Sequence, residues 1–197
     1  MFEGTPLIKR IFYINVAAFI LTLILASINI SVFHYFAQWS YKGDNFYPWQ
    51  LITHQFLHGG FIHIIFNMLA LLSIGPHVEK YLGENKFLPF YLICGVGSAM
   101  LHMTLTSNLN IPMVGASGAI FGLLACFSII HPNEKVYAFF IPVGIKAKYL
   151  IGALIMLEII LGLLSKSDGI GHWAHVGGAL TGILLYLFNK KFLNNIY

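Results

Sequence analysis

Charged residues are scarce in this chain. Only 9% of its 197 residues are Asp, Glu, Lys or Arg and 58% are hydrophobic, whereas an ordinary soluble domain has roughly 25% charged residues. Linkers, internal repeats and low-complexity tracts are also missing, so residues 1–197 are expected to form a single domain. The two cysteines, Cys94 and Cys126, lack CxxC spacing and are interpreted as small buried apolar residues. These absences argue against a soluble protein and favour one compact membrane bundle.

Long apolar runs, by contrast, recur along the whole chain. A backbone that spans a membrane must satisfy its own polar groups, so each run predicts a helix. Together they predict an all-α, polytopic membrane protein with six crossings. The first run is long enough to span, which favours a retained helix over a cleaved signal peptide. The predicted helices are 11–33, 61–82, 87–105, 117–131, 149–164 and 173–188.

The positions of lysine and arginine predict the orientation. Nine of the 11 fall on the side of the bundle that holds both termini, and only Lys42 and Lys166 fall on the other side. Both termini are therefore expected in the cytoplasm. Because basic residues that flank helices mark topology, the net charge of +4 requires no nucleic-acid partner. The outer loop, 34–60, is rich in aromatic residues, as is typical of segments in the lipid headgroup layer.

The six-helix order brings four polar side chains to one depth. The second, fourth and sixth helices run in the same direction, so their N-terminal ends share the outer half of the membrane. His63 and Asn67 lie near the start of the second, Ser117 at the start of the fourth and His175 near the start of the sixth. A serine nucleophile, a histidine base and an i, i+4 pair of oxyanion donors are the groups that acyl transfer needs. The sequence therefore predicts a hydrolytic site near the outer surface.

Glycines around these residues predict close helix packing. Gly118 and Gly122 form one small-xxx-small face, and Gly178 and Gly182 form another. Contact between the two faces would bring Ser117 and His175 within hydrogen-bonding distance.

Two further features of the serine segment suggest how the site is built. The stretch 107–115, ending at Gly115, is expected to be non-helical backbone that lines a water-filled cavity. Phe121, one turn after Ser117, is positioned to stack on the imidazole of His175.

Several polar residues have a simpler interpretation. A single serine or Gly-xxx-Gly in a membrane helix usually serves packing. His54, His58 and His172 near the outer interface are expected to be solvated or structural. Neither HExxH nor three convergent ligands occur, so no metal site is expected. Glu158, deep in the fifth helix, is interpreted as a packing residue, with a gate or substrate contact as the alternative.

The motifs resemble those of the rhomboid family of intramembrane serine proteases. Gly115-Ala116-Ser117-Gly118 is similar to the family's GxSG motif, and Ala174-His175 with Gly178 is similar to AHxxG. His63 and Asn67 are similar to the HxxxN oxyanion motif, and Gly75, Glu79 and Gly83 match a structural GxxxExxxG element. The resemblance implies a rhomboid-type six-helix bundle with a catalytic Ser117–His175 dyad and no metal or nucleotide cofactor. It also implies cleavage of transmembrane segments of single-span or polytopic membrane proteins.

Two residues depart from the family pattern. Gln50 follows Trp49 where the family usually has arginine, and Phe121 stands where bacterial members often have tyrosine. No aspartate is placed to complete a triad, because Asp44 and Asp168 fall in outer loops. A catalytically weak or inactive rhomboid-like protein that binds transmembrane helices is the alternative function. A transporter is disfavoured, since the halves lack paired broken helices and a path of charges.

Overall fold

The computed structural model describes residues 4–106, 111–137, 143–164 and 169–194, with side chains described up to residue 188. Its longer helices are α1 (Pro6–Ser27), α4 (Phe61–Leu82), α5 (Glu84–Leu105), α6 (Ser117–Ile130), α7 (Ala147–Leu164) and α8 (His172–Asn194). Short helices α2 (Val32–Phe36), α3 (Gln50–Thr53) and the 3₁₀ helix η1 (His54–Phe56) lie between α1 and α4. Strands β1 (Lys135–Val136) and β2 (Ile145–Lys146) pair in a small hairpin. The predicted all-α class is confirmed.

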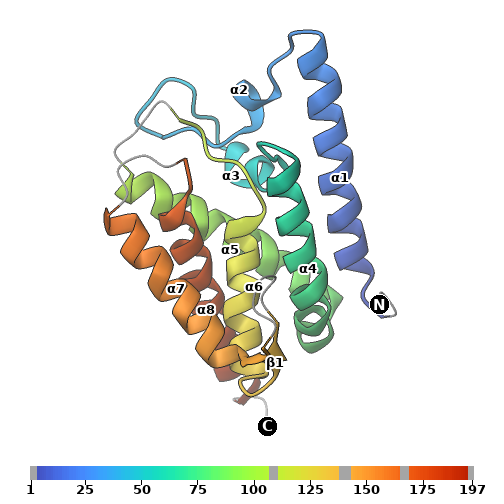
Figure 1. The fold of residues 1–197 in the computed structure, drawn as a ribbon, viewed down its shortest axis with the longest axis vertical. Helices are drawn as coiled ribbons and strands as arrows, with labels where there is room; N and C mark the ends of the chain where they lie inside the picture. Colours follow the sequence, from blue (N-terminus) through green and yellow to red (C-terminus); the bar gives the residue numbers. More distant parts are fainter. Residues whose placement is uncertain (1–3, 107–110, 138–142, 165–168, 195–197) are drawn as a thin grey trace.

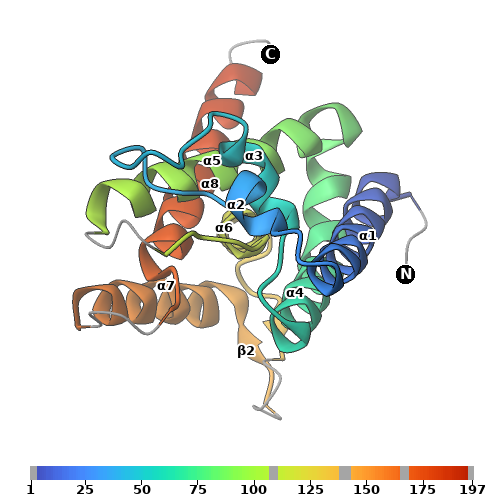
Figure 2. The same cartoon turned by 90° about the horizontal axis from the view of Figure 1, so that it is seen from above.

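The long helices form a six-helix membrane bundle of the predicted type. Four of them, α1, α4, α5 and α7, are long and apolar enough to cross a membrane. Helix α6 has only 14 residues, about 21 Å at 1.5 Å per residue, and lies in the middle of the bundle (Figure 2). The N-terminal end of α1 and the C-terminal end of α8 lie at the same end of the bundle, opposite α2 and α3 (Figure 1).

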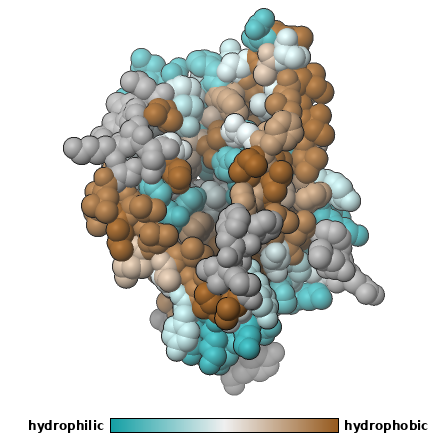
Figure 3. All heavy atoms as spheres, in the orientation of Figure 1, coloured by the Kyte–Doolittle hydropathy of each residue, from teal (hydrophilic) through white to brown (hydrophobic). Residues whose placement is uncertain are grey.

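The outer surface of the bundle is apolar where the helices face outward. Figure 3 shows hydrophobic surface over α1 and α7 between more hydrophilic ends. Large hydrophobic side chains on these helices are half exposed or more, among them Ile14, Leu21, Met156 and Leu163. An apolar surface of this extent is unfavourable in water and suits contact with lipid. The protein is therefore an integral membrane protein.

The first helix differs from its predicted range of 11–33. It begins at Pro6 because the carboxylate of Glu79 accepts hydrogen bonds from the backbone N–H groups of Leu7 and Ile8, both at 2.9 Å. A buried carboxylate at a helix N-terminus also stabilises the positive end of the helix dipole. The helix ends at Ser27, and Asn29 then adopts a positive φ of 61°.

The contact between α1 and α4 also explains the GxxxExxxG element. A Cβ at Gly75 would collide with the side chain of Ile8, so the glycine lets α1 pack closely against α4. Gly83 has a φ of +74° and connects α4 to α5 in a conformation that side chains disfavour. The element is therefore structural, as predicted.

Three of the other long helices extend beyond their apolar runs, whereas α4 spans its predicted range of 61–82 and α6 ends at Ile130 rather than at 131. Helix α5 begins at Glu84 rather than 87, α7 begins at Ala147 rather than 149, and α8 spans His172–Asn194 rather than 173–188. The predicted ranges were too short because polar residues at a membrane surface can continue a helix that the apolar pattern no longer marks.

The loop between α1 and α4 is organised around Gln50. Its side chain is fully buried, and its Oε1 accepts hydrogen bonds from the backbone N–H groups of Trp39 and Tyr47 at 3.3 and 3.1 Å. Its Nε2 donates to the carbonyls of Tyr35 and Asn45 at 3.3 and 3.0 Å. A neutral amide thus donates and accepts within one loop, which an arginine cannot do because it lacks an acceptor.

Candidate active site

Ser117 is the first residue of the central helix α6. The preceding residues 111–115 are non-helical, as predicted, whereas 107–110 lie outside the described residues. Gly115 has a φ of +125°, and its backbone N–H donates to the His54 carbonyl at 2.9 Å. A glycine is required there, since a side chain would be strained at this φ and its Cβ would lie 2.7 Å from His63 Nε2. This turn fixes where Ser117 lies.

The glycine faces of α6 and α8 make the predicted contact. A Cβ at Gly178 would overlap the carbonyl oxygen of Gly118, and a Cβ at Gly182 would lie 2.8 Å from the Cα of Gly122. The two backbones therefore touch, which is the close approach that small-xxx-small faces permit. The contact begins one turn below His175 and brings the start of α8 beside the start of α6.

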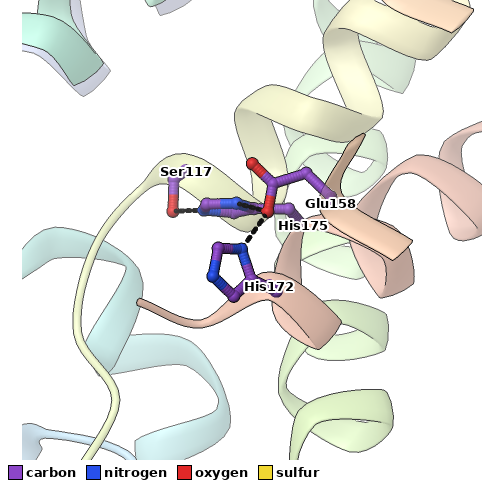
Figure 4. A network of polar contacts seen from close by, with 4 residues as sticks. All are labelled: Ser117, Glu158, His172 and His175. Carbon is purple, nitrogen blue, oxygen red and sulfur yellow. Dashed lines mark hydrogen bonds and ion pairs between the residues drawn. The ribbon is translucent and has the colours of Figure 1, made fainter. Parts of the chain in front are cut away.

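The approach of the two helices joins Ser117 to His175. The Nε2 of His175 lies 2.9 Å from the Oγ of Ser117 (Figure 4). Phe121 stacks on the imidazole, with ring centroids 4.4 Å apart and planes inclined by 7°. This confirms the predicted stacking, and it restricts rotation of the imidazole away from the serine.

His63 and Asn67 of α4 line the same site. Both line the same cavity as Ser117 and His175, one helical turn apart on α4. The Nδ1 of His63 accepts a long hydrogen bond of 3.4 Å from the Gly59 N–H, which leaves the proton on Nε2. A neutral histidine in this tautomer can donate from Nε2 toward an oxyanion. All four polar residues predicted to share one depth are thus brought together.

The cavity above these residues has a volume of about 940 Å³. Its walls come from α4, α5, α6, α7 and α8 and from the residues just before α6 and α8, including Met113 and Ile170. This space is large enough for several residues of an extended peptide or for many water molecules. Water can therefore reach Ser117, as hydrolysis of an acyl intermediate requires.

Glu158 of α7 lies beside the histidine, a position that the sequence interpretation missed. Its Oε2 lies 2.6 Å from His172 Nδ1 and 3.0 Å from His175 Nδ1 (Figure 4). The shorter contact is a hydrogen bond. The longer contact has an ion-pair distance, but it is poorly aligned and His175 Nδ1 forms no well-directed hydrogen bond. The only sequence signal was a carboxylate in the middle of an apolar helix.

Contrary to the expectation that no three ligands converge, the same cluster forms a candidate cation site within the described residues. Glu158, His172 and His175 each offer one ligand atom, and these atoms lie within 4.8 Å of one another. The set matches the nitrogen and oxygen donors that zinc accepts. His175 would have to bind through Nδ1, which would leave the proton on Nε2 and prevent that atom from accepting the Ser117 proton.

His54, His58 and His172 are buried, so of the two predicted alternatives, solvated or structural, burial agrees with the structural one. Their side chains are 1%, 1% and 5% exposed. Burial lowers the pKa of His54 to about 4, although a 2.7 Å hydrogen bond to the Gln50 carbonyl favours the protonated form. Burial, with a smaller effect of His63, lowers the pKa of His58 to about 4. Both are therefore neutral at pH 7, and the His54 carbonyl accepts the hydrogen bond that holds Gly115.

Comparison with known proteins identifies the domain. The model of the Rhomboid domain matches residues 45–191. The chain is 38% identical over 146 residues to RHOMBOID-like protein 4 of Arabidopsis thaliana, covering 73% of this chain and 34% of that protein. It is 33% identical over 135 residues to the rhomboid protease GluP of Bacillus subtilis, covering 68% of this chain and 24% of that protein.

A shorter relative matches over more of its own length. The putative rhomboid protease YdcA of Bacillus subtilis is 32% identical over 139 residues, which is 70% of this chain and 65% of that protein. The matches to the first relatives span about a third to two fifths of those proteins' lengths.

Proposed function

The chain belongs to the rhomboid family, and on that premise we propose that it is an intramembrane serine protease that uses a Ser117–His175 dyad. The observation that carries this proposal is the 2.9 Å contact between Ser117 Oγ and His175 Nε2 at the floor of a cavity. Two relatives are named as rhomboid proteases, one of them putative, which supports the same activity. Residues 1–197 are proposed to act as one membrane domain.

The proposed reaction is acyl transfer to Ser117. As Oγ attacks the carbonyl carbon of the scissile peptide bond, its proton passes to His175 Nε2. His175 then gives this proton to the leaving amine, and an acyl-enzyme remains on Ser117. Water from the cavity attacks the ester while His175 again takes up a proton. Hydrolysis releases the second product and restores the serine.

The tetrahedral intermediates carry a negative oxygen that needs hydrogen-bond donors. His63 Nε2 and the Asn67 amide are proposed for this role, because both line the cavity around Ser117. The backbone N–H groups at the start of α6 add the positive end of its helix dipole. Gly115, Gly118, Phe121, Gly178 and Gly182 are proposed to support the site through the contacts described above.

The proposed substrates are membrane proteins, either single-span or polytopic, cut near the outer face of the bilayer. The site lies at the end of the bundle opposite the N-terminal end of α1 and the C-terminal end of α8 (Figure 1). The distribution of lysine and arginine supports the proposal that this opposite end faces outside and both termini lie in the cytoplasm, as in a bacterial cytoplasmic membrane.

Labelling with a fluorophosphonate tests the proposal directly. The purified protein in detergent is expected to form a covalent adduct on Ser117, and Ser117→Ala and His175→Ala are expected to abolish it. EDTA is expected to leave labelling and cleavage unchanged. An inactive rhomboid-like protein that only binds transmembrane helices would retain binding but would not be labelled. Labelling that persists in Ser117→Ala, or activity lost in EDTA and restored by zinc, would overturn the dyad mechanism.

A further inference from the structure

Glu158 reaches the histidine from the side opposite the serine. Figure 4 shows Ser117, the His175 ring and the Glu158 carboxylate in succession, with His172 below the same carboxylate. Ser117 Oγ lies 2.9 Å from Nε2, and Glu158 Oε2 lies 3.0 Å from Nδ1. The three groups come from α6, α8 and α7. A serine, a histidine and a carboxylate are therefore in sequential contact.

The nearby carboxylate bears on which tautomer His175 adopts. A carboxylate only accepts hydrogen bonds, so its proximity favours the form of the imidazole that carries its proton on Nδ1. In that form Nε2 has a free lone pair, and this is the atom that faces Ser117 Oγ. Only this tautomer can remove the serine proton.

His172 holds the carboxylate in place. Its Nδ1 forms a 2.6 Å hydrogen bond to the same Oε2 that approaches His175. His172 is 5% exposed and begins α8, three residues before His175. The hydrogen bond therefore ties α7 to the helix that carries the base, and it restricts the rotamers of Glu158.

We propose that Glu158 is a positioning residue that acts through His175, so that the site works as a Ser117–His175–Glu158 array. The inference rests on the proposed protease function. During attack, the proton of Ser117 Oγ moves to His175 Nε2, and the Nδ1 proton stays on the ring. The carboxylate remains ionised and stabilises the positive charge that the imidazole acquires. No proton passes to Glu158, and no other reactant is required.

Glu158→Gln tests this role because it keeps the shape of the side chain and removes its charge. In soluble Ser-His-Asp proteases the corresponding change lowers kcat by about 10⁴-fold. The contact here is less well aligned, so the maximal rate of fluorophosphonate labelling is expected to fall by about 10²-fold. The probe concentration for half-maximal rate is expected to stay unchanged, because Glu158 does not contact the probe. Glu134→Gln is the matched control, since Glu134 is exposed in the loop between α6 and β1, and it is expected to label at the normal rate.

A second comparison distinguishes a positioning role of Glu158 from a role that only holds His172 in place. If Glu158 served only to hold His172, then Glu158→Gln would have no further effect in a His172→Gln background. The proposal expects the labelling rate to fall again in the double variant, by about 10-fold or more. A Glu158→Gln rate within about threefold of the normal rate, or no further loss in the double variant, would overturn the inference. Failure of the unmodified protein to label at all would overturn the protease function instead.

Discussion

Gly178 of α8 lies directly on the backbone of Gly118 in α6, with no space between them for even one side-chain carbon. The contact connects helix packing to chemistry, because Ser117 precedes Gly118 and His175 lies one turn before Gly178. Any change that separates the two helices also separates the serine from its base.

Gly178→Ala is therefore expected to impair both stability and activity. Insertion of a methyl group into a closed contact typically costs about 1–3 kcal/mol, and a misplacement of about 1 Å can lower a rate by about 10²-fold. Melting temperature and labelling rate in detergent measure the two effects. Gly152→Ala in α7 is the matched control, because a Cβ there meets nothing within 4 Å. Equal behaviour of the two variants would contradict the packing argument.

Asn67→Ala is expected to slow turnover without weakening substrate binding. Loss of one oxyanion donor lowers kcat by roughly 10²–10³-fold in other acyl-transfer sites, and His63→Ala is expected to have a comparable or smaller effect. KM should change little, because the donors act on charge that develops after binding. A variant that keeps its turnover and only melts earlier would show that Asn67 is structural.

Gln50→Arg is expected to destabilise the outer loop, even though arginine is usual in the family at this position. The N–H groups of Trp39 and Tyr47 would lose their acceptor, and a buried unsatisfied group costs about 1–3 kcal/mol. A lower melting temperature in detergent is the measurement. Asp44→Ala, at an exposed position of the same loop, is expected to have no effect. A more stable Gln50→Arg protein would show that the loop can rearrange around the larger side chain.

Acid is expected to destabilise the protein through His54 and His58. Their folded pKa values of about 4 lie below the ordinary value of 6.5, so the unfolded chain binds more protons between these two pH values. Stability is thus fully present above about pH 6.5 and is lost as pH falls toward 4, by about 1.4 kcal/mol per pH unit for each histidine.

His58→Phe isolates one of these two contributions. Neither ring nitrogen of His58 forms a well-directed hydrogen bond within the described part of the chain, so phenylalanine should be tolerated at pH 7. Melting temperatures between pH 7 and pH 4.5 are expected to fall less steeply in the variant. An unchanged slope would show that other groups control the acid response.

The substrate helix must open locally before it is cut. Its peptide bonds are shielded by their own hydrogen bonds, and the cavity lies beside the N-terminal ends of α6 and α8, at the end of the bundle proposed to face outward. A single-span protein with a small residue and a helix-weakening glycine or proline in its outer half is expected to be cleaved there. Replacing both with leucine should prevent cleavage without preventing insertion. Mass spectrometry of the products locates the cut, and a cut in the cytoplasmic half would contradict the proposed depth.

Much of the helical architecture could be predicted from local patterns of apolar residues and glycines in the sequence. Runs of apolar residues predict membrane helices because the backbone polar groups of a segment in the bilayer must form hydrogen bonds with one another. The order of the helices then brings Ser117, His175, His63 and Asn67 to one end of the bundle. The spacing of glycines predicted the α6–α8 contact for a similar reason, since a four-residue repeat of small residues lies on one helix face.

Contacts between side chains on separate helices could not be predicted from the sequence. A run of apolar residues does not show how α7 is rotated about its own axis. Nothing in the sequence therefore indicated that Glu158 faces His175 and His172 rather than lipid. Glu79 reaches the start of α1, and Gln50 reaches loop carbonyls up to 15 residues away, because folding juxtaposes groups that sequence separates. Periodicity fixes a residue's helix and depth, whereas long-range packing fixes which side chain it meets.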